Sequence, residues 1–308
     1  MKYDTIIVGG GPAGLSAALV LGRCRRRVVV IDASKPRNAA SHHMHNYLSR
    51  DGIAPAKFLG LGRGELERYG VEFRPGFVRR AECAEDGFRV FVGRSRLESR
   101  TLLLATGVAD ELPEVRSLRT FYGSGVHHCP YCDAWEYRDK PIAAYGDGKR
   151  GLGLAMNLLT WTDRVTVVTD GRPMSATDRR RAERLGIAVR DEPVRRLAGR
   201  TPEGRRPKLE RVVFESGPDL RISALFFNTD QYQRSPLPGL LGCSIGEDGG
   251  VQRDRRQRTG VPGLYLAGDA SKDVQFVIVA ASEGARAGVG INSDLQREDL
   301  RRKPGRSG

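Results

Sequence analysis

Cysteine is scarce in this chain, and its spacing does not fit a metal site. Only five cysteines occur among 308 residues, and Cys24, Cys83 and Cys243 stand singly. So few dispersed cysteines exclude a secreted disulfide scaffold and indicate a reducing compartment. A structural zinc site would need further ligands beside Cys129 and Cys132, and no second pair of cysteines exists. We therefore expect no metal.

Long hydrophobic runs are also absent. No apolar stretch approaches the roughly 18 to 20 residues that span a bilayer. The chain opens with MKYDTIIVGGG, a buried strand running into a turn, which leaves no room for a signal peptide. We expect a cytoplasmic protein without membrane contact, and its 308 residues suggest two domains.

Negative charge is in deficit, because the formal net charge is +14. The arginines are spread along the chain, and they form neither an aromatic-interleaved stripe nor the spacing of a nucleic-acid-binding motif. We expect a solvated basic surface and no nucleic-acid partner. The alternative is that the charge steers an acidic macromolecular partner.

The most informative motif is Cys129-Pro130-Tyr131-Cys132, which is followed by Asp133. Two thiols separated by two residues can close a small disulfide and store two electrons, and nearby groups make one thiolate nucleophilic. The motif therefore favours thiol–disulfide exchange over zinc binding. His127 and His128 precede it, and they either supply a base for a substrate thiol or are plain turn residues.

A dinucleotide-binding pattern begins the chain. TIIVGGGPAGLSAALVLGRCRRRVVVID predicts a strand, a turn, a helix and a second strand, with Gly9, Gly11 and Gly14 forming G-x-G-x-x-G. These glycines allow the tight turn, the approach of a pyrophosphate and close helix packing. Asp32 ends the second strand, where a carboxylate accepts hydrogen bonds from ribose hydroxyls.

Two further turns follow apolar strands, at Ala105-Thr106-Gly107 and at Gly268-Asp269. In this order the three segments resemble the flavoprotein pyridine-nucleotide-disulfide reductases. With the C-x-x-C between the last two, the chain resembles the small thioredoxin reductases. The resemblance implies an α/β fold with two nucleotide-binding-type three-layer domains, the FAD domain being split by an inserted C-x-x-C-bearing domain. The expected bounds are 1–112 and 243–296 for the FAD domain, 113–242 for the insertion and 297–308 for a disordered basic tail.

The resemblance also implies the roles of the site residues. Cys132 exchanges electrons with the flavin, Cys129 attacks the substrate disulfide and Asp133 shuttles protons, with His128 as a further catalytic candidate. A homodimer and a rotation of the inserted domain are likewise implied. The expected FAD contacts are Gly9, Gly11, Pro12, Ala13, Gly14, Asp32, Asn46, Ala105, Thr106, Gly107, Gly268, Asp269, Phe276 and Val277.

The sequence departs from this family in two informative places. A second G-x-G-x-x-G at Gly146, Gly148 and Gly151 suggests a nicotinamide nucleotide, but Asp170 stands where the family has cations that bind the 2′-phosphate of NADPH. A carboxylate there repels that phosphate, so we predict that NADPH is a poor reductant. Phe276 and Val277 replace a Gln and an Ala that approach the flavin.

These departures resemble a divergent branch that includes the dithiol oxidases acting on gliotoxin- and holomycin-like compounds and reductases lacking the nucleotide motif. Our leading hypothesis is an FAD-dependent disulfide oxidoreductase that acts on a thioredoxin-like protein or on a small-molecule disulfide or dithiol. An acidic protein is a candidate electron donor. One alternative is a dithiol oxidase with oxygen as acceptor, and another is a flavin-bearing, redox-sensing interaction module.

Overall fold

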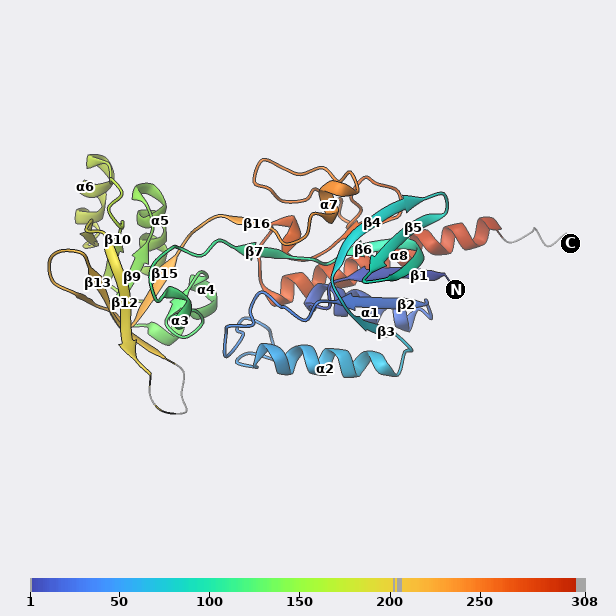
Figure 1. Cartoon of the computed structure of the whole chain (residues 1–308), viewed down its shortest axis with the longest axis horizontal. Coiled ribbons are helices and arrows are strands. Elements are labelled where there is room, and N and C mark those ends of the chain that lie inside the picture. The colour runs from blue at the N-terminus through green and yellow to red at the C-terminus, as the bar shows by residue number, and fades with distance from the viewer. Residues whose placement is uncertain (1, 202, 204–206, 303–308) are drawn as a thin grey trace, which may run out of the picture. The chain divides into compact units, whose positions relative to one another are not determined.

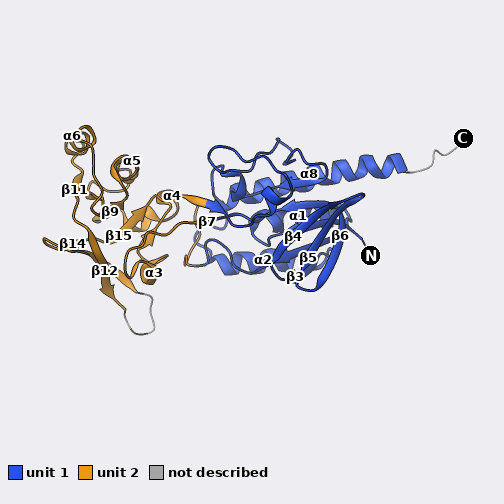
Figure 2. Ribbon diagram, turned by 45° about the horizontal axis from the view of Figure 1, so that its top comes forward, with its two compact units in different colours: residues 1–39, 46–109, 232–308 blue, residues 40–45, 110–231 orange. Residues whose placement is uncertain are grey.

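The computed structural model describes residues 2–201, 203 and 207–302. The chain forms two compact units (Figures 1 and 2). Unit 1 comprises Met1–Ala39, Asn46–Ala109 and Tyr232–Gly308, and unit 2 comprises Ala40–His45 and Asp110–Gln231. Unit 2 is thus inserted into unit 1, and a short segment of the first third of the chain belongs to it.

The inserted unit ends earlier than the predicted boundary at 242. Strand β16 (Gln231–Gln233) pairs with β7 (Val108–Asp110) where the chain passes between the units. The residues that follow it join unit 1, because helix α7 (Leu237–Leu240) packs Leu237 into the apolar core of that unit. The first boundary likewise falls at 109, before the predicted 112.

Unit 1 is built on a seven-stranded sheet in the order β3-β2-β1-β6-β5-β4, with β17 also pairing with β6. The pairs that β1 makes with β2 and β6 are parallel, as are those of β2 with β3 and of β6 with β17, whereas β4, β5 and β6 form an antiparallel meander. The strands are β1 (Tyr3–Val8), β2 (Val28–Asp32), β3 (Glu72–Pro75), β4 (Val78–Ala84), β5 (Gly87–Val92), β6 (Ser95–Leu104) and β17 (Leu264–Leu266).

The parallel strands are apolar along their whole length because both faces of the sheet are covered. Ile7 and Val30 face helices α1 (Pro12–Arg23), α2 (Pro55–Glu67) and α8 (Val277–Arg302), whereas Ile6 and Val29 face the layer that includes β4 and β5. Helices α1 and α8 lie against each other (Figure 1). Their approach requires Gly284, since a Cβ there would lie 2.0 Å from the carbonyl oxygen of Ala13. This packing fixes the start of α1 beside the start of α8.

The predicted disordered tail from 297 is wrong for its first residues, because α8 continues to Arg302. Asp299 accepts hydrogen bonds from Arg26 and Arg100, each at 2.6 Å, and Glu298 binds Arg100 at 2.8 Å. These ion pairs tie the last helical turns to the sheet. Residues 303–308 of the predicted tail lie outside the described residues.

Unit 2 contains a five-stranded parallel sheet in the order β11-β10-β9-β15-β8 and a separate antiparallel sheet β12-β13-β14. The strands are β8 (Val126–His127), β9 (Ile142–Tyr145), β10 (Val165–Val168), β11 (Ala188–Arg190), β12 (Val194–Arg200), β13 (Lys208–Phe214), β14 (Leu220–Arg221) and β15 (Ala224–Phe227). The helices are α3 (Leu118–Phe121), α4 (Pro130–Asp133), α5 (Gly148–Leu158) and α6 (Ala176–Arg184). The described part of the chain also contains two 3₁₀ turns, η1 (Ala134–Tyr137) in unit 2 and η2 (Asp269–Ser271) in unit 1.

Both units therefore have the α/β character predicted from the sequence. Among the described residues, no helix has the length and apolar character needed to cross a bilayer.

Candidate active site

The first glycine-rich turn forms a cradle at the start of α1. Gly9 has φ +110°, and a Cβ there would lie 2.2 Å from the carbonyl oxygen of Ala105. A Cβ at Gly14 would lie 1.9 Å from the carbonyl oxygen of Gly9, so both positions require glycine. At Gly11, by contrast, nothing lies within 4 Å of the Cβ position. That open space lies at the helix start, where backbone N–H groups bind phosphate.

Asp32 ends β2 beside this turn and already carries an ion pair. Arg63 Nη2 from α2 lies 2.5 Å from Asp32 Oδ2, and the Asp32 side chain is 18% exposed. A Cβ at Gly10 would lie 2.8 Å from Asp32 Cγ, so the carboxylate lies directly against the glycine-rich turn. Arg63 was not foreseen from the sequence, because nothing in an arginine on a surface helix indicates its partner 31 residues away.

The turn after β6 leaves one polar atom without a partner. The backbone N–H of Ala105 donates to Val8, and Gly107 has φ +65°. Between them, the hydroxyl of Thr106 is buried and has no hydrogen-bond partner in the described part of the chain. A buried unpaired hydroxyl costs free energy, so this one is best explained by a bound group that supplies the missing hydrogen bond.

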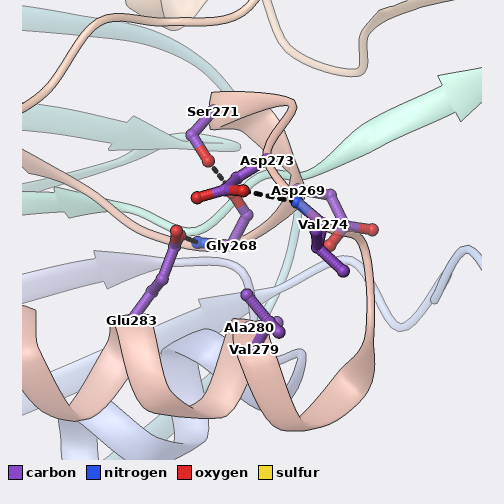
Figure 3. Close-up of a pocket in the computed structure, with 8 residues that line it drawn as sticks. All are labelled: Gly268, Asp269, Ser271, Asp273, Val274, Val279, Ala280 and Glu283. Atoms are coloured by element: carbon purple, nitrogen blue, oxygen red, sulfur yellow. Dashed lines mark hydrogen bonds between the residues drawn. The ribbon is translucent and has the colours of Figure 1, made fainter.

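The Gly268-Asp269 turn lines a small pocket (Figure 3). Gly268 has φ +85°, and its N–H donates to Oε2 of Glu283 at 2.7 Å. Glu283 is buried on α8 and also forms an ion pair with Arg253. The turn is therefore held in place by a buried carboxylate that has a cationic partner. Arg37 Nη1 lies 3.0 Å from Asp269 Oδ2. The pocket is lined by Gly268, Asp269, Ser271, Asp273, Val274, Val279, Ala280 and Glu283.

These residues of unit 1 fit FAD. The open cradle at Gly11 suits a pyrophosphate, the Thr106 hydroxyl lacks a partner, and Asp32 and Asp269 supply carboxylates. Pro12 and Ala13 form the first turn of α1, and Val277 is the first residue of α8. Phe276 lies directly before Val277.

Asn46 also belongs to unit 1. It has φ +64°, and its N–H donates to Asp51 Oδ1 at 2.9 Å. Its predicted role at the flavin stays a prediction.

In unit 2, Cys129 and Cys132 form a disulfide with Cα atoms 5.3 Å apart. Cys129 is the N-cap of α4, and the N–H of Cys132 donates to Cys129 Sγ at 3.2 Å. The remaining cysteines do not pair. Cys24 and Cys83 are exposed, and burial raises the pKa of the Cys243 thiol. Among the described residues, no group of three His, Cys, Asp or Glu side chains could hold a metal ion.

Asp133 is held by His127 rather than by His128. His127 is buried, and its Nδ1 lies 3.2 Å from Asp133 Oδ1 while its Nε2 lies 3.1 Å from the Tyr137 hydroxyl. Burial, together with the negative charges of Asp133 and Glu136, raises the pKa of Tyr137 to about 12.

His128 makes different contacts. Its Nδ1 is 3.0 Å from the Tyr122 hydroxyl, and its Nε2 is 3.9 Å from Asp110 Oδ2. The predicted role of His128 as a catalytic residue stays a prediction.

The second glycine-rich turn differs from the first at its middle glycine. A Cβ at Gly148 would lie 3.2 Å from the carbonyl oxygen of Pro173 and 3.5 Å from Cα of Met174. The equivalent direction at Gly11 is open. The loop after β10 therefore lies against the middle glycine of this turn, whereas nothing lies against the middle glycine of the first turn.

Asp170 has two hydrogen-bond donors of its own. The Tyr145 hydroxyl donates to Oδ2 at 2.5 Å, and the N–H of Val194 donates to Oδ1 at 2.6 Å. Arg172 lies 4.0 Å from the same carboxylate. Asp170, which the sequence predicts to repel a 2′-phosphate, therefore also fixes the end of β9 and the start of β12.

Comparison with known proteins agrees with this arrangement. The family model for pyridine nucleotide-disulphide oxidoreductases matches residues 3–284. The chain belongs to this family. It is 28% identical to "Thioredoxin reductase sirT" of Leptosphaeria maculans, over 97% of this chain and 96% of that protein. Among solved structures, thioredoxin reductase from Streptococcus pyogenes is 25% identical with a TM-score of 0.87, covering 96% of this chain and 99% of that one. HlmI is 34% identical with a TM-score of 0.89, covering 97% and 94%.

The family membership confirms the fold class and the enzyme class predicted from the sequence. The protein is an FAD-dependent disulfide oxidoreductase of the thioredoxin reductase type, and its C-x-x-C is present as a disulfide. Its electron partner and the roles of single residues are matters of proposal.

Proposed function

We propose that this enzyme exchanges electrons between the Cys129–Cys132 pair and a disulfide or dithiol substrate, without NADPH as an efficient donor. The observation that carries the proposal is the Cys129–Cys132 disulfide, which lies next to an acid already held by a hydrogen-bond network. Bound FAD supplies the two-electron chemistry on the other side of this pair. In this proposal Cys132 exchanges electrons with the flavin, and Cys129 attacks the substrate disulfide.

Proton transfer falls to Asp133. When Cys129 attacks a substrate disulfide, the leaving sulfur needs a proton, and a carboxyl adjacent to Cys132 is well placed along the chain to provide it. The cofactor is held by Gly9, Gly11 and Gly14 at its pyrophosphate and by Asp32 at a ribose. Thr106 and Asp269 supply further polar contacts, with Phe276 and Val277 as apolar neighbours.

The exclusion of NADPH rests on the middle glycine of the second turn. The carbonyl oxygen of Pro173 would lie 3.2 Å from a Cβ at Gly148, on the side from which a pyrophosphate would approach the turn. The negative charge of Asp170 adds to this obstacle, although part of it is met by the Tyr145 hydroxyl and by Arg172. Binding would therefore require the loop after β10 to move, and that displacement lowers affinity.

The substrate class follows from the family. The pair reduces or oxidises a thioredoxin-like protein or a small-molecule disulfide or dithiol. An acidic protein is the electron donor that best suits a chain of net charge +14. We also propose a homodimer that works in the cytoplasm.

The same obstacle at Gly148 favours a second candidate, a dithiol oxidase. In that direction a small dithiol loses two electrons and two protons to become a disulfide, and oxygen takes them to become hydrogen peroxide. The chemistry at Cys129, Cys132 and Asp133 is the reverse of the reductase steps, so one site serves both.

Stopped-flow reduction under nitrogen tests the proposal. We expect a small dithiol to bleach the flavin, and NADPH or NADH at sub-millimolar concentration to do so far more slowly. Complete bleaching by NADPH within about a second, a time typical of efficient turnover, would identify an ordinary NADPH-dependent reductase. Oxygen uptake that depends on the dithiol would favour the oxidase over the reductase.

A further inference from the structure

His127 joins three side chains in a row beside the disulfide. Tyr137 from η1 contacts its Nε2 at 3.1 Å, and Asp133 from α4 contacts its Nδ1 at 3.2 Å. The ring is 6% exposed and packs against Phe226 of β15, with ring centroids 5.4 Å apart. A buried histidine with both nitrogens engaged has a fixed orientation.

The hydrogen positions in this row follow from the partners. A carboxylate only accepts, so His127 Nδ1 must carry a hydrogen that points at Asp133. In neutral His127, Nε2 is then an acceptor, and the Tyr137 hydroxyl donates to it. Because burial keeps the pKa of Tyr137 high, that phenol stays protonated across the working range. In the neutral ring the row runs in one direction, from Tyr137 through His127 to Asp133, whereas in the imidazolium Nε2 donates to the Tyr137 oxygen instead.

The charges around His127 come from several elements. Asp133 contacts it from α4, and Glu136 of η1 acts on the adjacent Tyr137. The Lys140 ammonium lies 5.8 Å from the centroid of the Tyr137 ring, and His45 pairs with Glu136 at 3.5 Å. Within the described residues, the carboxylate in contact with the His127 ring is that of Asp133.

A carboxyl alone is a poor proton donor at neutral pH. In water a carboxyl of this type titrates near about 3.9 and an imidazole near about 6.5, so the imidazole holds its proton over a range in which the carboxyl has lost it. A carboxylate that is hydrogen-bonded to an imidazolium can pass on the proton that the imidazolium holds. The pair therefore acts as an acid at a pH where an isolated aspartate does not.

We propose that His127 is a positioning residue that orients Asp133 and resupplies its proton during disulfide exchange, with Tyr137 fixing the imidazole from behind. This inference rests on the proposed function of Cys129, Cys132 and Asp133.

In the first step the Cys129 thiolate attacks the substrate disulfide, so that a Cys129–sulfur bond forms and the substrate S–S bond breaks. The leaving thiolate takes a proton that the His127 imidazolium gives up from Nδ1 and that the Asp133 carboxylate passes on, and His127 is left neutral. In the second step the Cys132 thiolate displaces the substrate's other sulfur as a thiolate, which water protonates, and the Cys129–Cys132 disulfide re-forms. The substrate gains the two electrons that the dithiol loses, and water restores the proton on His127.

The proposal predicts that the need for His127 depends on the leaving thiol. An aryl thiol with a low pKa leaves readily without a proton, whereas an alkyl thiol benefits from one. The probes are 5,5′-dithiobis(2-nitrobenzoate) and bis(2-hydroxyethyl) disulfide. Each is mixed under nitrogen with holoenzyme that has been reduced by dithiothreitol and freed of it, and the first turnover is followed.

For His127→Asn we expect the rate with the alkyl disulfide to fall about 100-fold, at the lower end of general acid–base effects. The rate with the aryl disulfide should stay within about twofold, because its leaving thiol needs no acid. For Tyr137→Phe we expect a loss of about three- to tenfold with the alkyl disulfide alone, the size of one hydrogen bond. The control Tyr265→Phe removes a buried phenol of unit 1 that donates to Asp294, and both rates should be unchanged.

The pH dependence gives a second readout that a structural role would not change. The ratio of the alkyl rate to the aryl rate cancels the ionisation of Cys129, so in the wild type it should fall as pH rises through the imidazole range. In His127→Asn the ratio should be low and flat. Equal slowing of both disulfides, or an unchanged alkyl rate in both variants, overturns the inference and leaves the proposed function intact. If His127→Asn does not fold, Tyr137→Phe decides by the same ratio. A wild type that reacts with neither disulfide overturns the proposed function and the inference with it.

Discussion

At the scale of single residues, each acid of the site is held by a basic partner. Asp32 pairs with Arg63 of α2, Asp269 with Arg37, and Asp133 with His127. Each partner fixes a carboxylate that would otherwise adopt several rotamers, which lowers the entropy cost of using it. Sequence patterns do not reveal the pairs of Asp32 and Asp269, since no local spacing links those residues to their partners, and the pair of His127 and Asp133 depends on how the turn around the C-x-x-C folds.

The two motif cysteines should be the only redox-active thiols. Cys132→Ser should leave Cys129 able to attack a substrate disulfide but unable to resolve it, so a stable mixed disulfide accumulates and turnover falls at least about 100-fold. Intact-protein mass spectrometry after incubation with substrate detects the added mass.

The controls are Cys83→Ser, at an exposed position, and Cys243→Ser, at a buried one. We expect both to keep turnover. Loss of turnover in either, or stoichiometric zinc that disappears in Cys132→Ser, would contradict the assignment of the redox pair.

Gly11 should be essential for the cofactor and dispensable for folding. Because nothing lies within 4 Å of its Cβ position, Gly11→Val fits the folded chain but fills the space of the pyrophosphate. We expect FAD affinity to fall at least about 100-fold, or about 2.7 kcal/mol, with the protein still folded by circular dichroism. Gly60→Val is the matched control, since its Cβ position is also open but lies on α2. Yellow Gly11→Val protein with a full flavin spectrum would contradict the site.

At the scale of elements, strands and turns near the cofactor follow from the sequence with little ambiguity. The apolar runs of β1 and β6 and the glycine turn before α1 are predicted by local pattern, and the structure contains them. The end of α8 was not predicted, because a run of charged residues resembles a disordered tail until its partners are known. Arg26 and Arg100 come from 273 and 199 residues away from Asp299.

Local pattern also missed the obstacle in the second glycine turn. Gly146, Gly148 and Gly151 match the spacing of the first turn, yet Pro173 lies against Gly148. The spacing of the glycines indicates that a helix can start at this turn. It does not indicate which residues from another part of the chain lie against that helix start. The contacts of His127 with Asp133 and Tyr137 could not be predicted for the same reason, since burial and the direction of a side chain depend on the tertiary fold.

The end of α8 should respond to acid. The hydrogen bond from Arg26, together with those from Arg100, lowers the pKa of Asp299. A carboxyl whose pKa is depressed in the folded state stabilises it above the unfolded pKa of about 3.9, and the stabilisation is lost as pH falls through the folded pKa. We expect Asp299→Asn to melt about 1 to 3 °C below the wild type near neutral pH. That gap should close as the pH falls below about 4. A gap that stays constant from acid to neutral pH would show that the ion pairs do not stabilise the helix.

At the scale of the whole molecule, the chain separates the two halves of its chemistry between two compact units. The residues that fit FAD belong to unit 1, and the disulfide with its acid belongs to unit 2, with β7 and β16 paired where the chain passes between them. The resemblance to the small thioredoxin reductases implied this inserted arrangement, and each unit has its own glycine turn and its own sheet. The bounds of the insertion were not predictable to the residue, since they depend on which core accepts Leu237.

The central claim is that electrons pass between bound flavin and substrate through Cys129 and Cys132. The most direct measurement is an anaerobic titration of the purified holoenzyme with a small dithiol, followed at the flavin absorbance band and repeated with Cys129→Ser. We predict that the dithiol bleaches the wild-type flavin and that Cys129→Ser, which retains FAD, is bleached at least about 100-fold more slowly. Bleaching of both proteins at the same rate, or of neither, would contradict the account.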